Sequence, residues 1–359
     1  MNKKIMRILI LLVITAVVLT GCAGGVRAES TPGLTVSADH VYIAYMTKVY
    51  QLDRLTGNLI GSYPAAPKNT LMMYAPPAVS DGGVFFGDLA NEFHKVSEAN
   101  LNELQWTFTG AKGWFQAKAT VNDNLVIVPC NDRNIYALNT DSGEQVWYYE
   151  GDFAFIAEPL IIGDKVVVSS QDHHIVVLDL ANGNELYRVE TQGAVVSSPL
   201  YVESTNSVYV GSLGRELTSF DLETGKVNWT FGENRNLATI WGTPILLEDE
   251  LIFVDKAGKI IALDPESSEQ LWMIEAGGSV VAGLAKVEGE GFLVALENGN
   301  LQFYGLDHFP KWAATVSGQI YSAPIVEGDL IYIPAVKGDS ILYTYNVTGQ
   351  QGWSYNPAN

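Results

Sequence analysis

The chain has 359 residues, of which 47% are hydrophobic and 17% charged, with 34 glycines and 14 prolines. This balance is typical of a folded protein with a large core and excludes a disordered chain and a multi-span membrane protein. Forty acidic residues against 21 basic ones give a formal net charge of −19, which argues against nucleic acid as a partner because phosphate binding requires a basic patch.

The first 21 residues have the pattern of a lipoprotein signal peptide. Three basic residues precede an apolar run at residues 8–19, which is too short to cross a bilayer as a helix. Residues 19–22 read Leu-Thr-Gly-Cys and resemble a bacterial lipobox, in which the cysteine is diacylated and begins the mature chain. The alternative is an ordinary secretory signal cleaved after Ala28. We expect a lipidated Cys22, followed by an anchored linker at residues 22–33.

This anchor predicts a location outside the cytoplasmic membrane. Acyl chains stabilise membrane binding by about 0.8 kcal/mol per buried CH₂. We expect the protein at the periplasmic leaflet of the outer membrane if the organism has one, and otherwise on the outer face of the cytoplasmic membrane.

Residues 34–359 contain a unit of about forty residues that repeats eight times. Each copy has short segments of alternating hydrophobicity separated by glycine, aspartate and asparagine, without helical periodicity. This pattern predicts an all-β fold, an eight-bladed β-propeller of four-stranded antiparallel blades. One aromatic residue recurs every 40 to 43 residues, and Gly61 takes its place in the first copy: Trp106, Trp147, Tyr187, Trp229, Trp272, Trp312 and Trp353.

The turn before the fourth segment has a recurring Asx residue followed four positions later by glycine. The Asx side chain can accept backbone N–H groups within the turn, and glycine supplies the positive φ that closes it. We therefore expect these residues to be structural rather than calcium ligands, and the aromatic residue after each glycine to be a packing anchor between blades. The clearest examples are Asp53–Gly57, Asn139–Gly143, Asp179–Gly183 and Asp221–Gly225.

The third and fourth segments resemble the pyrroloquinoline-quinone-like (PQQ-like) repeat. Residues 137–139, 177–179 and 262–264 read Ala-Leu-Asn, Val-Leu-Asp and Ala-Leu-Asp, and a Gly-x-x-x-Trp-x-Phe/Tyr pattern follows in several copies. The resemblance covers about nine tenths of the chain. Two groups carry this repeat on eight blades: quinoprotein dehydrogenases, and the non-catalytic propeller lipoproteins of the outer-membrane β-barrel assembly machinery. Length, lipobox and the lack of an appended domain favour the second group.

Resemblance to the dehydrogenases implies a quinone in the channel, a Ca²⁺ ion, an aspartate base and often a disulfide between neighbouring cysteines. The two cysteines, Cys22 and Cys130, are far apart, so that disulfide is impossible, and none of the five histidines has metal-motif spacing. Glu158 stands where other copies have a small residue before an aligned proline, and it is the candidate cofactor-binding residue. We expect no catalytic residue, metal or cofactor; the alternative is PQQ with calcium.

The connections between blades predict a partner-binding patch. Two of them, residues 62–75 and 230–243, are three residues longer than the others and carry methionine and aromatic residues, which are common in interface cores. Aligning the copies on prolines such as Pro76 and Pro199 places apolar pairs at one register. The alternative is that these pairs begin the innermost strands and are buried. The candidates are Met72, Met73, Tyr74, Trp114, Phe115, Phe155, Trp241 and Tyr321.

The sequence thus predicts a monomeric, lipid-anchored propeller that scaffolds other envelope proteins. The resemblance implies outer-membrane protein assembly as the specific setting. A quinone-binding oxidoreductase is one alternative. A surface carbohydrate-binding or adhesion module is another, and binding to a glycan array would identify it. We also expect the ring to close by packing of complete blades, without exchange of a strand between the two ends of the chain.

Overall fold

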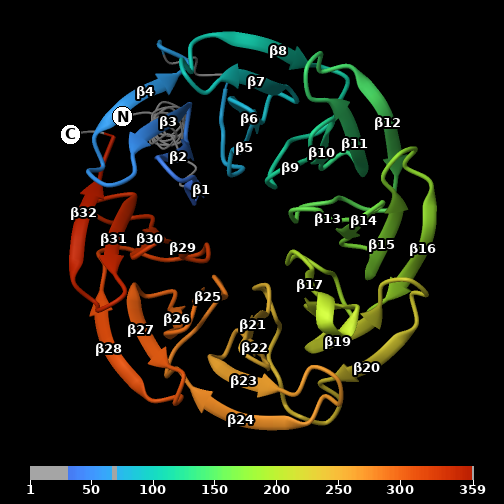
Figure 1. The fold of residues 1–359 in the computed structure, drawn as a ribbon, viewed down its shortest axis with the longest axis vertical. Helices are drawn as coiled ribbons and strands as arrows, with labels where there is room; N and C mark the ends of the chain where they lie inside the picture. The colour runs from blue at the N-terminus through green and yellow to red at the C-terminus, as the bar shows by residue number, and fades with distance from the viewer. Residues whose placement is uncertain (1–30, 67–70, 358–359) are drawn as a thin grey trace, which may run out of the picture.

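The computed structural model describes residues 31–66 and 71–357, and these form an eight-bladed β-propeller, as predicted (Figure 1). The signal peptide and Cys22 lie outside the described residues. Within the described ranges, the structure has no helix long and apolar enough to cross a membrane.

Each blade is one four-stranded sheet in which strands that are consecutive in sequence pair antiparallel. The first strand of each blade lies near the centre of the ring and the fourth at the rim (Figure 1). Blades 1 to 4 are β1 (Gly33–Val36), β2 (His40–Tyr45), β3 (Lys48–Asp53), β4 (Leu59–Tyr63); β5 (Ala78–Ser80), β6 (Gly83–Gly87), β7 (Phe93–Ser97), β8 (Leu104–Phe108); β9 (Thr120–Val121), β10 (Leu125–Pro129), β11 (Asn134–Asn139), β12 (Gln145–Glu150); and β13 (Leu160–Ile162), β14 (Lys165–Ser169), β15 (His174–Asp179), β16 (Glu185–Glu190).

The second half of the ring repeats this order, with one 3-10 turn, η1 (Glu203–Thr205), inserted after the first strand of blade 5. Blades 5 to 8 are β17 (Leu200–Val202), β18 (Ser207–Ser212), β19 (Glu216–Asp221), β20 (Val227–Phe231); β21 (Ile245–Leu247), β22 (Glu250–Val254), β23 (Lys259–Leu263), β24 (Gln270–Glu275); β25 (Leu284–Val287), β26 (Gly291–Ala295), β27 (Asn300–Gly305), β28 (Pro310–Thr315); and β29 (Ile325–Glu327), β30 (Leu330–Pro334), β31 (Leu342–Asn346), β32 (Gln351–Tyr355).

The hydrophobic core consists of clusters at the junctions between neighbouring blades. In the described part of the chain there are eight such clusters, one at each junction. Successive side chains of a strand point to opposite faces: Val166 of β14 packs in the cluster with blade 3, and Val167 in the cluster with blade 5. The second and third strands are therefore apolar on both faces.

The recurring aromatic residues are anchors between blades, as predicted. Trp106, Trp147 and Trp312 donate their indole N–H to a backbone carbonyl of the next blade, at 3.0, 2.9 and 2.9 Å. Each indole ring also lies against the turn glycine of that next blade, for example Trp147 against Gly183. The glycine of one blade thus makes room for the tryptophan of the preceding blade, a coupling that the sequence analysis did not predict.

Blade 6 departs from this pattern. Trp272 donates to Glu250 Oε2 at 2.9 Å, and its ring packs at 4.4 Å from the ring of His308, which lies in the corresponding turn of blade 7. His308 Nε2 lies 3.1 Å from the same glutamate oxygen. A histidine thus packs against the indole at a junction where the next blade has no turn glycine under the tryptophan.

The Asx turns are structural, as expected. Asp221 Oδ1 accepts the backbone N–H of Thr224 at 2.8 Å and its hydroxyl at 2.7 Å. The hydrogen bond from that hydroxyl, with the backbone bond, lowers the pKa of Asp221 below its ordinary value because both bonds favour the ionised carboxylate. Gly225 closes the turn with φ 69°, and in blade 6 Ser268 adopts the same left-handed conformation at φ 60°.

The ring closes by packing between complete blades, as expected, since blade 1 contains β1–β4 and blade 8 contains β29–β32. At this seam the carbonyl of Arg54 accepts hydrogen bonds from Trp353 Nε1 at 3.3 Å and the Tyr332 hydroxyl at 3.2 Å. The Arg54 guanidinium donates in turn to the carbonyl of Glu327 at 3.2 Å. The seam therefore uses the same tryptophan-to-carbonyl contact as the junctions made by Trp106, Trp147 and Trp312.

Candidate functional site

The connections between blades and the turns between second and third strands open on the same face of the ring, because strand direction alternates within each blade. We call this the connection face. On it, each connection contributes one buried residue whose N–H is bonded to the preceding blade. Examples are Phe115 to the Asp88 carbonyl at 3.3 Å, Phe155 to Cys130 at 3.3 Å, and Ile240 to Ser212 at 3.1 Å.

Three of the residues predicted to contact a partner are buried in the structure, and this part of the prediction is corrected. Met73, Phe115 and Phe155 are at most 2% exposed and belong to the clusters at three different junctions. They close the ends of these clusters, and their burial stabilises the fold because it removes apolar surface from water. They are therefore unavailable to a partner.

The alignment on Pro76 was also displaced by one residue. The carbonyl of Pro77 accepts the hydroxyl of Thr35 at 2.6 Å, as the carbonyl of Pro159 accepts that of Thr120 at 2.5 Å. Pro77 is thus the structural equivalent of Pro159. In this register the buried position of blade 2 is occupied by Met73.

The remaining candidates keep accessible surface. Trp114 is 49% exposed and Trp241 37% exposed, whereas Met72, Tyr74 and Tyr321 are half-buried. The long connection before blade 6 therefore divides its predicted pair: Ile240 is fully buried and Trp241 lies outside.

Trp241 is held in place by its surroundings. Its indole N–H donates to Thr239 Oγ1 at 2.9 Å, and Lys256 Nζ lies 5.4 Å from the ring centroid, a cation–π contact that favours one ring orientation. The connection itself is fixed by Asp255, whose Oδ2 accepts the Ala238 N–H at 2.8 Å. A rigid, partly exposed aromatic loses little conformational entropy on binding a partner.

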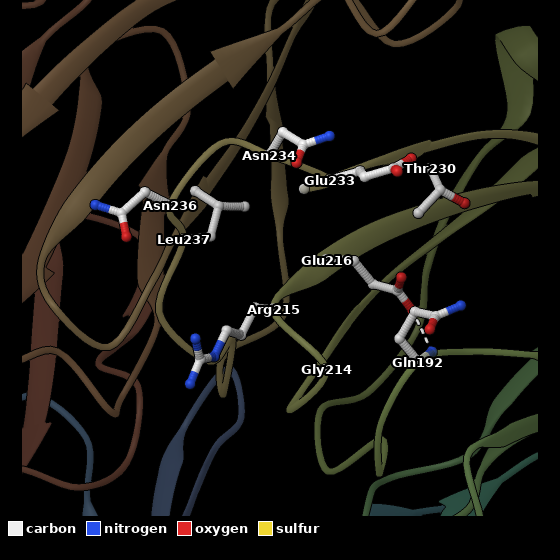
Figure 2. Close-up of a pocket in the computed structure, with 10 residues that line it drawn as sticks. Gln192, Gly214, Arg215, Glu216, Thr230, Glu233, Asn234, Asn236 and Leu237 are labelled. Atoms are coloured by element: carbon white, nitrogen blue, oxygen red, sulfur yellow. Dashed lines mark hydrogen bonds between the residues drawn. The ribbon is translucent and has the colours of Figure 1, made fainter.

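The same connection borders a pocket of about 600 Å³ on the connection face (Figure 2). Its lining is mostly polar and carries charges of both signs: Gln192, Gly214, Arg215, Glu216, Thr230, Gly232, Glu233, Asn234, Asn236 and Leu237. The sequence analysis did not predict this pocket. Its signal in the sequence is the extra length of this connection together with the polar residues 233–236 within it.

The two adjacent charged residues at the pocket wall have different surroundings. Glu216 is 5% exposed and accepts the Gln192 N–H at 2.5 Å, and burial raises the pKa of its carboxyl group. Arg215 has φ 68°, and Figure 2 shows its guanidinium turned away from Glu216 toward the side of Asn236. Glu216 therefore supports the turn, whereas Arg215 presents a charged group with five N–H donors to the pocket.

Glu158 has a partner that the sequence did not identify. Its Oε1 lies 2.8 Å from Lys118 Nζ, and both side chains are about one third exposed. In the corrected register, Lys118 holds the same position in blade 3 that Glu158 holds in blade 4. The positive charge of the lysine neutralises the carboxylate. Glu158 therefore does not fit the role of the calcium-binding carboxylate that a quinone site requires.

Cys130 is fully buried, and its Sγ lies 3.3 Å from the carbonyl of Gly113. Burial raises the pKa of this thiol to about 12. The thiolate, which is the nucleophilic form, is therefore disfavoured at neutral pH. Cys130 is a packing residue between blades 2 and 3.

The family model described as outer membrane protein assembly factor BamB matches residues 45–183 and 153–280. The chain belongs to this family. The matched ranges span the Asx turns at residues 53–57, 139–143, 179–183 and 221–225, the aromatic anchors of blades 2 to 6 and the long connection with Trp241. A BamB-like propeller of PQQ-like repeats is thus shown by the sequence and by the architecture together.

Two curated relatives carry the name outer membrane protein assembly factor BamB. The protein from Burkholderia pseudomallei (strain K96243) is 27% identical over 113 residues, which are 32% of this chain and 29% of that protein. The protein from Nitrosomonas eutropha (strain DSM 101675 / C91 / Nm57) is 25% identical over 113 residues, 31% of this chain and 27% of that protein. The aligned segment thus spans less than a third of either relative.

Solved structures show the same fold. The crystal structure of BamB from Moraxella catarrhalis superposes with a TM-score of 0.75 at 17% identity, covering 87% of this chain and 95% of that one. The computationally designed Ika8 protein superposes with a TM-score of 0.73 at 14% identity, covering 89% and 97%. A designed protein matches nearly as well as a natural one, so this likeness supports the fold and not the function.

Proposed function

We propose that this protein is an outer-membrane protein assembly factor whose propeller binds other envelope proteins and has no catalytic activity. The observation that carries the proposal is the family match across residues 45–280. The two named relatives, though aligned over short segments, carry the same description. In this proposal the propeller stands in the periplasm, tethered to the outer membrane by the lipid on Cys22.

The connection face is the surface that we assign to the partner. Trp241 and Arg215 belong to the residue types that contribute most to binding at interfaces. Arg215 lines the pocket from the turn between β18 and β19, and Trp241 lies on the connection that borders the pocket. The pocket offers donors and acceptors, which suits a polar peptide segment with backbone groups to satisfy. Trp114, Met72, Tyr74 and Tyr321 remain candidates on the same face.

Deletion of the gene in its own organism is expected to lower the amounts of outer-membrane β-barrel proteins. The full wild-type chain should restore them, whereas a chain with Trp241→Ser and Arg215→Ser should not. Loss of two such interface residues weakens binding by about tenfold or more. Quantitative mass spectrometry of outer-membrane fractions provides the measurement.

Phe309→Ser is the matched control for this experiment. Phe309 is the most exposed aromatic residue among the described hydrophobic side chains, at 69%, and the turn that carries it, between β27 and β28, opens on the opposite face. This variant should restore the barrel proteins. Full restoration by the folded double variant would refute the assigned surface, and unchanged barrel proteins after deletion would refute the assembly function.

We further propose that the central channel binds no quinone. The support is the ion pair between Lys118 and Glu158, in which the candidate calcium-binding carboxylate already has a cationic partner. Calorimetric titration of the full chain with pyrroloquinoline quinone, with and without Ca²⁺, should give no saturable heat. Micromolar binding that requires Ca²⁺ and is lost in Glu158→Ala would contradict this proposal and favour the oxidoreductase.

A further inference from the structure

The β6–β7 hairpin of blade 2 brings together three groups that are typical metal ligands. His94 Nε2 lies 3.2 Å from Asp88 Oδ2 and 3.9 Å from Glu92 Oε2, and one donor atom from each residue lies within 4.8 Å of the other two. Zinc bound tetrahedrally at 2.0–2.2 Å by nitrogen and oxygen holds neighbouring donors about 3.3–3.5 Å apart. The three groups therefore need only small side-chain movements to share one ion.

The surrounding residues direct the remaining donor atoms toward one another, and His94 Nε2 and Asp88 Oδ2 are hydrogen-bonded to each other at 3.2 Å. His94 Nδ1 lies 3.1 Å from Thr107 Oγ1, which leaves Nε2 for a ligand. Asp88 Oδ1 accepts the backbone N–H groups of Ala90 and Glu92 at 2.8 and 2.9 Å, which leaves Oδ2. Such outer hydrogen bonds orient metal-binding histidines and carboxylates in known sites.

Blade 6 has the same hairpin without the metal-binding set. Asp255 occupies the position of Asp88, since the backbone N–H of each donates the hydrogen bond that closes its turn, to the carbonyl of Lys259 and of Glu92 respectively. Both oxygens of Asp255 accept backbone N–H groups, from Lys259 at 3.0 Å and Ala238 at 2.8 Å.

The strand register of blade 6 places Lys259 where blade 2 has Glu92, and Ile261 where blade 2 has His94. The turn itself therefore requires the aspartate alone. The added glutamate and histidine of blade 2 call for another explanation.

The hairpin also contains an unsatisfied polar atom. Asn91 lies between Asp88 and Glu92 with φ 70°, and its side-chain Oδ1 is buried without a hydrogen-bond partner in the described structure. Buried polar atoms are nearly always satisfied by protein, water or an ion. The hairpin that carries the three groups thus also has an acceptor that a bound water could satisfy.

Burial and access are both suited to an ion. The side chains of Asp88 and His94 are 0% and 3% exposed, and Tyr63 and Phe86 pack around the imidazole with ring centroids at 6.1 and 5.4 Å. The Glu92 side chain is 42% exposed, so it forms the entrance. Tyr63 belongs to β4, so the site lies at the junction of blades 1 and 2.

We propose that Asp88, Glu92 and His94 bind one divalent transition-metal ion of the zinc class at the junction of blades 1 and 2. His94 binds through Nε2 and releases the proton shared with Asp88, and water completes the coordination. The site is distinct from the connection-face pocket and is independent of the proposed function.

The test is titration of the full chain, freed of tags and treated with chelator, with ZnCl₂ in a calorimeter and with CoCl₂ by visible absorption. One ion per chain should bind at micromolar concentration, with the absorption of a low-symmetry nitrogen–oxygen site. Glu92→Gln and His94→Ala should each lower the affinity about tenfold or more. Zinc should also raise the Tm of the wild type but not of the variants.

His174→Ala is the control, because the His174–Asp172 pair has a similar contact at 3.3 Å on a more exposed hairpin; this variant should bind zinc like the wild type. Glu92→Gln keeps the test valid even if His94→Ala fails to fold, since the Glu92 side chain is partly exposed. Absence of saturable binding, or binding unchanged in Glu92→Gln, would overturn the proposal.

Discussion

Trp106→Ala is expected to lower the free energy of unfolding by about 3–5 kcal/mol, the range for removal of a large buried aromatic side chain. Trp106 is 8% exposed and packs between Phe85 and Phe93, with ring centroids at 5.9 and 6.2 Å. Its indole N–H donates to the Thr140 carbonyl of blade 3 at 3.0 Å. The substitution removes this packing and hydrogen bond from one junction at once.

Urea denaturation followed by fluorescence and circular dichroism measures this loss. Trp106→Phe should cost about 1–2 kcal/mol, because it keeps most of the ring packing and loses the N–H donor. Trp114→Ala is the control, since this tryptophan is 49% exposed, and should cost less than about 1 kcal/mol. An equal loss for Trp106→Ala and Trp114→Ala would refute the role of the anchor.

Gly183→Ala is expected to lower the free energy of unfolding by about 2–4 kcal/mol. Gly183 has φ +73°, and an added Cβ would lie 2.4 Å from Cε3 of Trp147, which is too close for any real contact. Left-handed backbone costs an alanine about 1–2 kcal/mol, and displacing the indole from its junction adds the remainder.

Gly163→Ala separates these two contributions. Gly163 lies in the same blade with φ +59°, and nothing lies within 4 Å of an added Cβ. Gly163→Ala should therefore lower the free energy of unfolding by only about 1–2 kcal/mol. In Trp147→Ala protein, Gly183→Ala should cost no more than Gly163→Ala, because the clash is gone. Equal costs for the two glycine substitutions in the wild type would show that the indole does not require the glycine.

The fold was predictable because one unit recurs eight times and each copy supports the interpretation of the others. Asx turns, glycines and tryptophans were assigned correctly from local chemistry. The pairing of Gly183 with Trp147 was not, because it joins different blades, and no pattern within one copy shows which neighbour a side chain meets. Blade 2 was misaligned because Pro76 and Pro77 offer two equivalent registers.

The candidate site was predicted less completely. Met72 and Met73 are equally apolar, so composition could not tell the buried residue from the half-buried one; the backbone direction at each connection decides it. Lys118 was missed as the partner of Glu158 because the register of blade 3 had no proline to mark it. The sequence does contain a signal for a site at His94, because a histidine stands in a third strand at the position where blade 6 has Ile261. Only the folded hairpin, however, brings Asp88 and Glu92 close to this histidine.

The closure of the ring by complete blades has a consequence for the order of the chain. Each junction, including the seam between blades 8 and 1, is made by side chains and turns rather than by a shared strand. The seam is thus equivalent to the junction between β12 and β13, which residues 151–159 connect. A linker of about that length from Tyr355 to Gly33 would yield circular permutants that begin at any blade, so the starting point of the chain is not a determinant of the architecture.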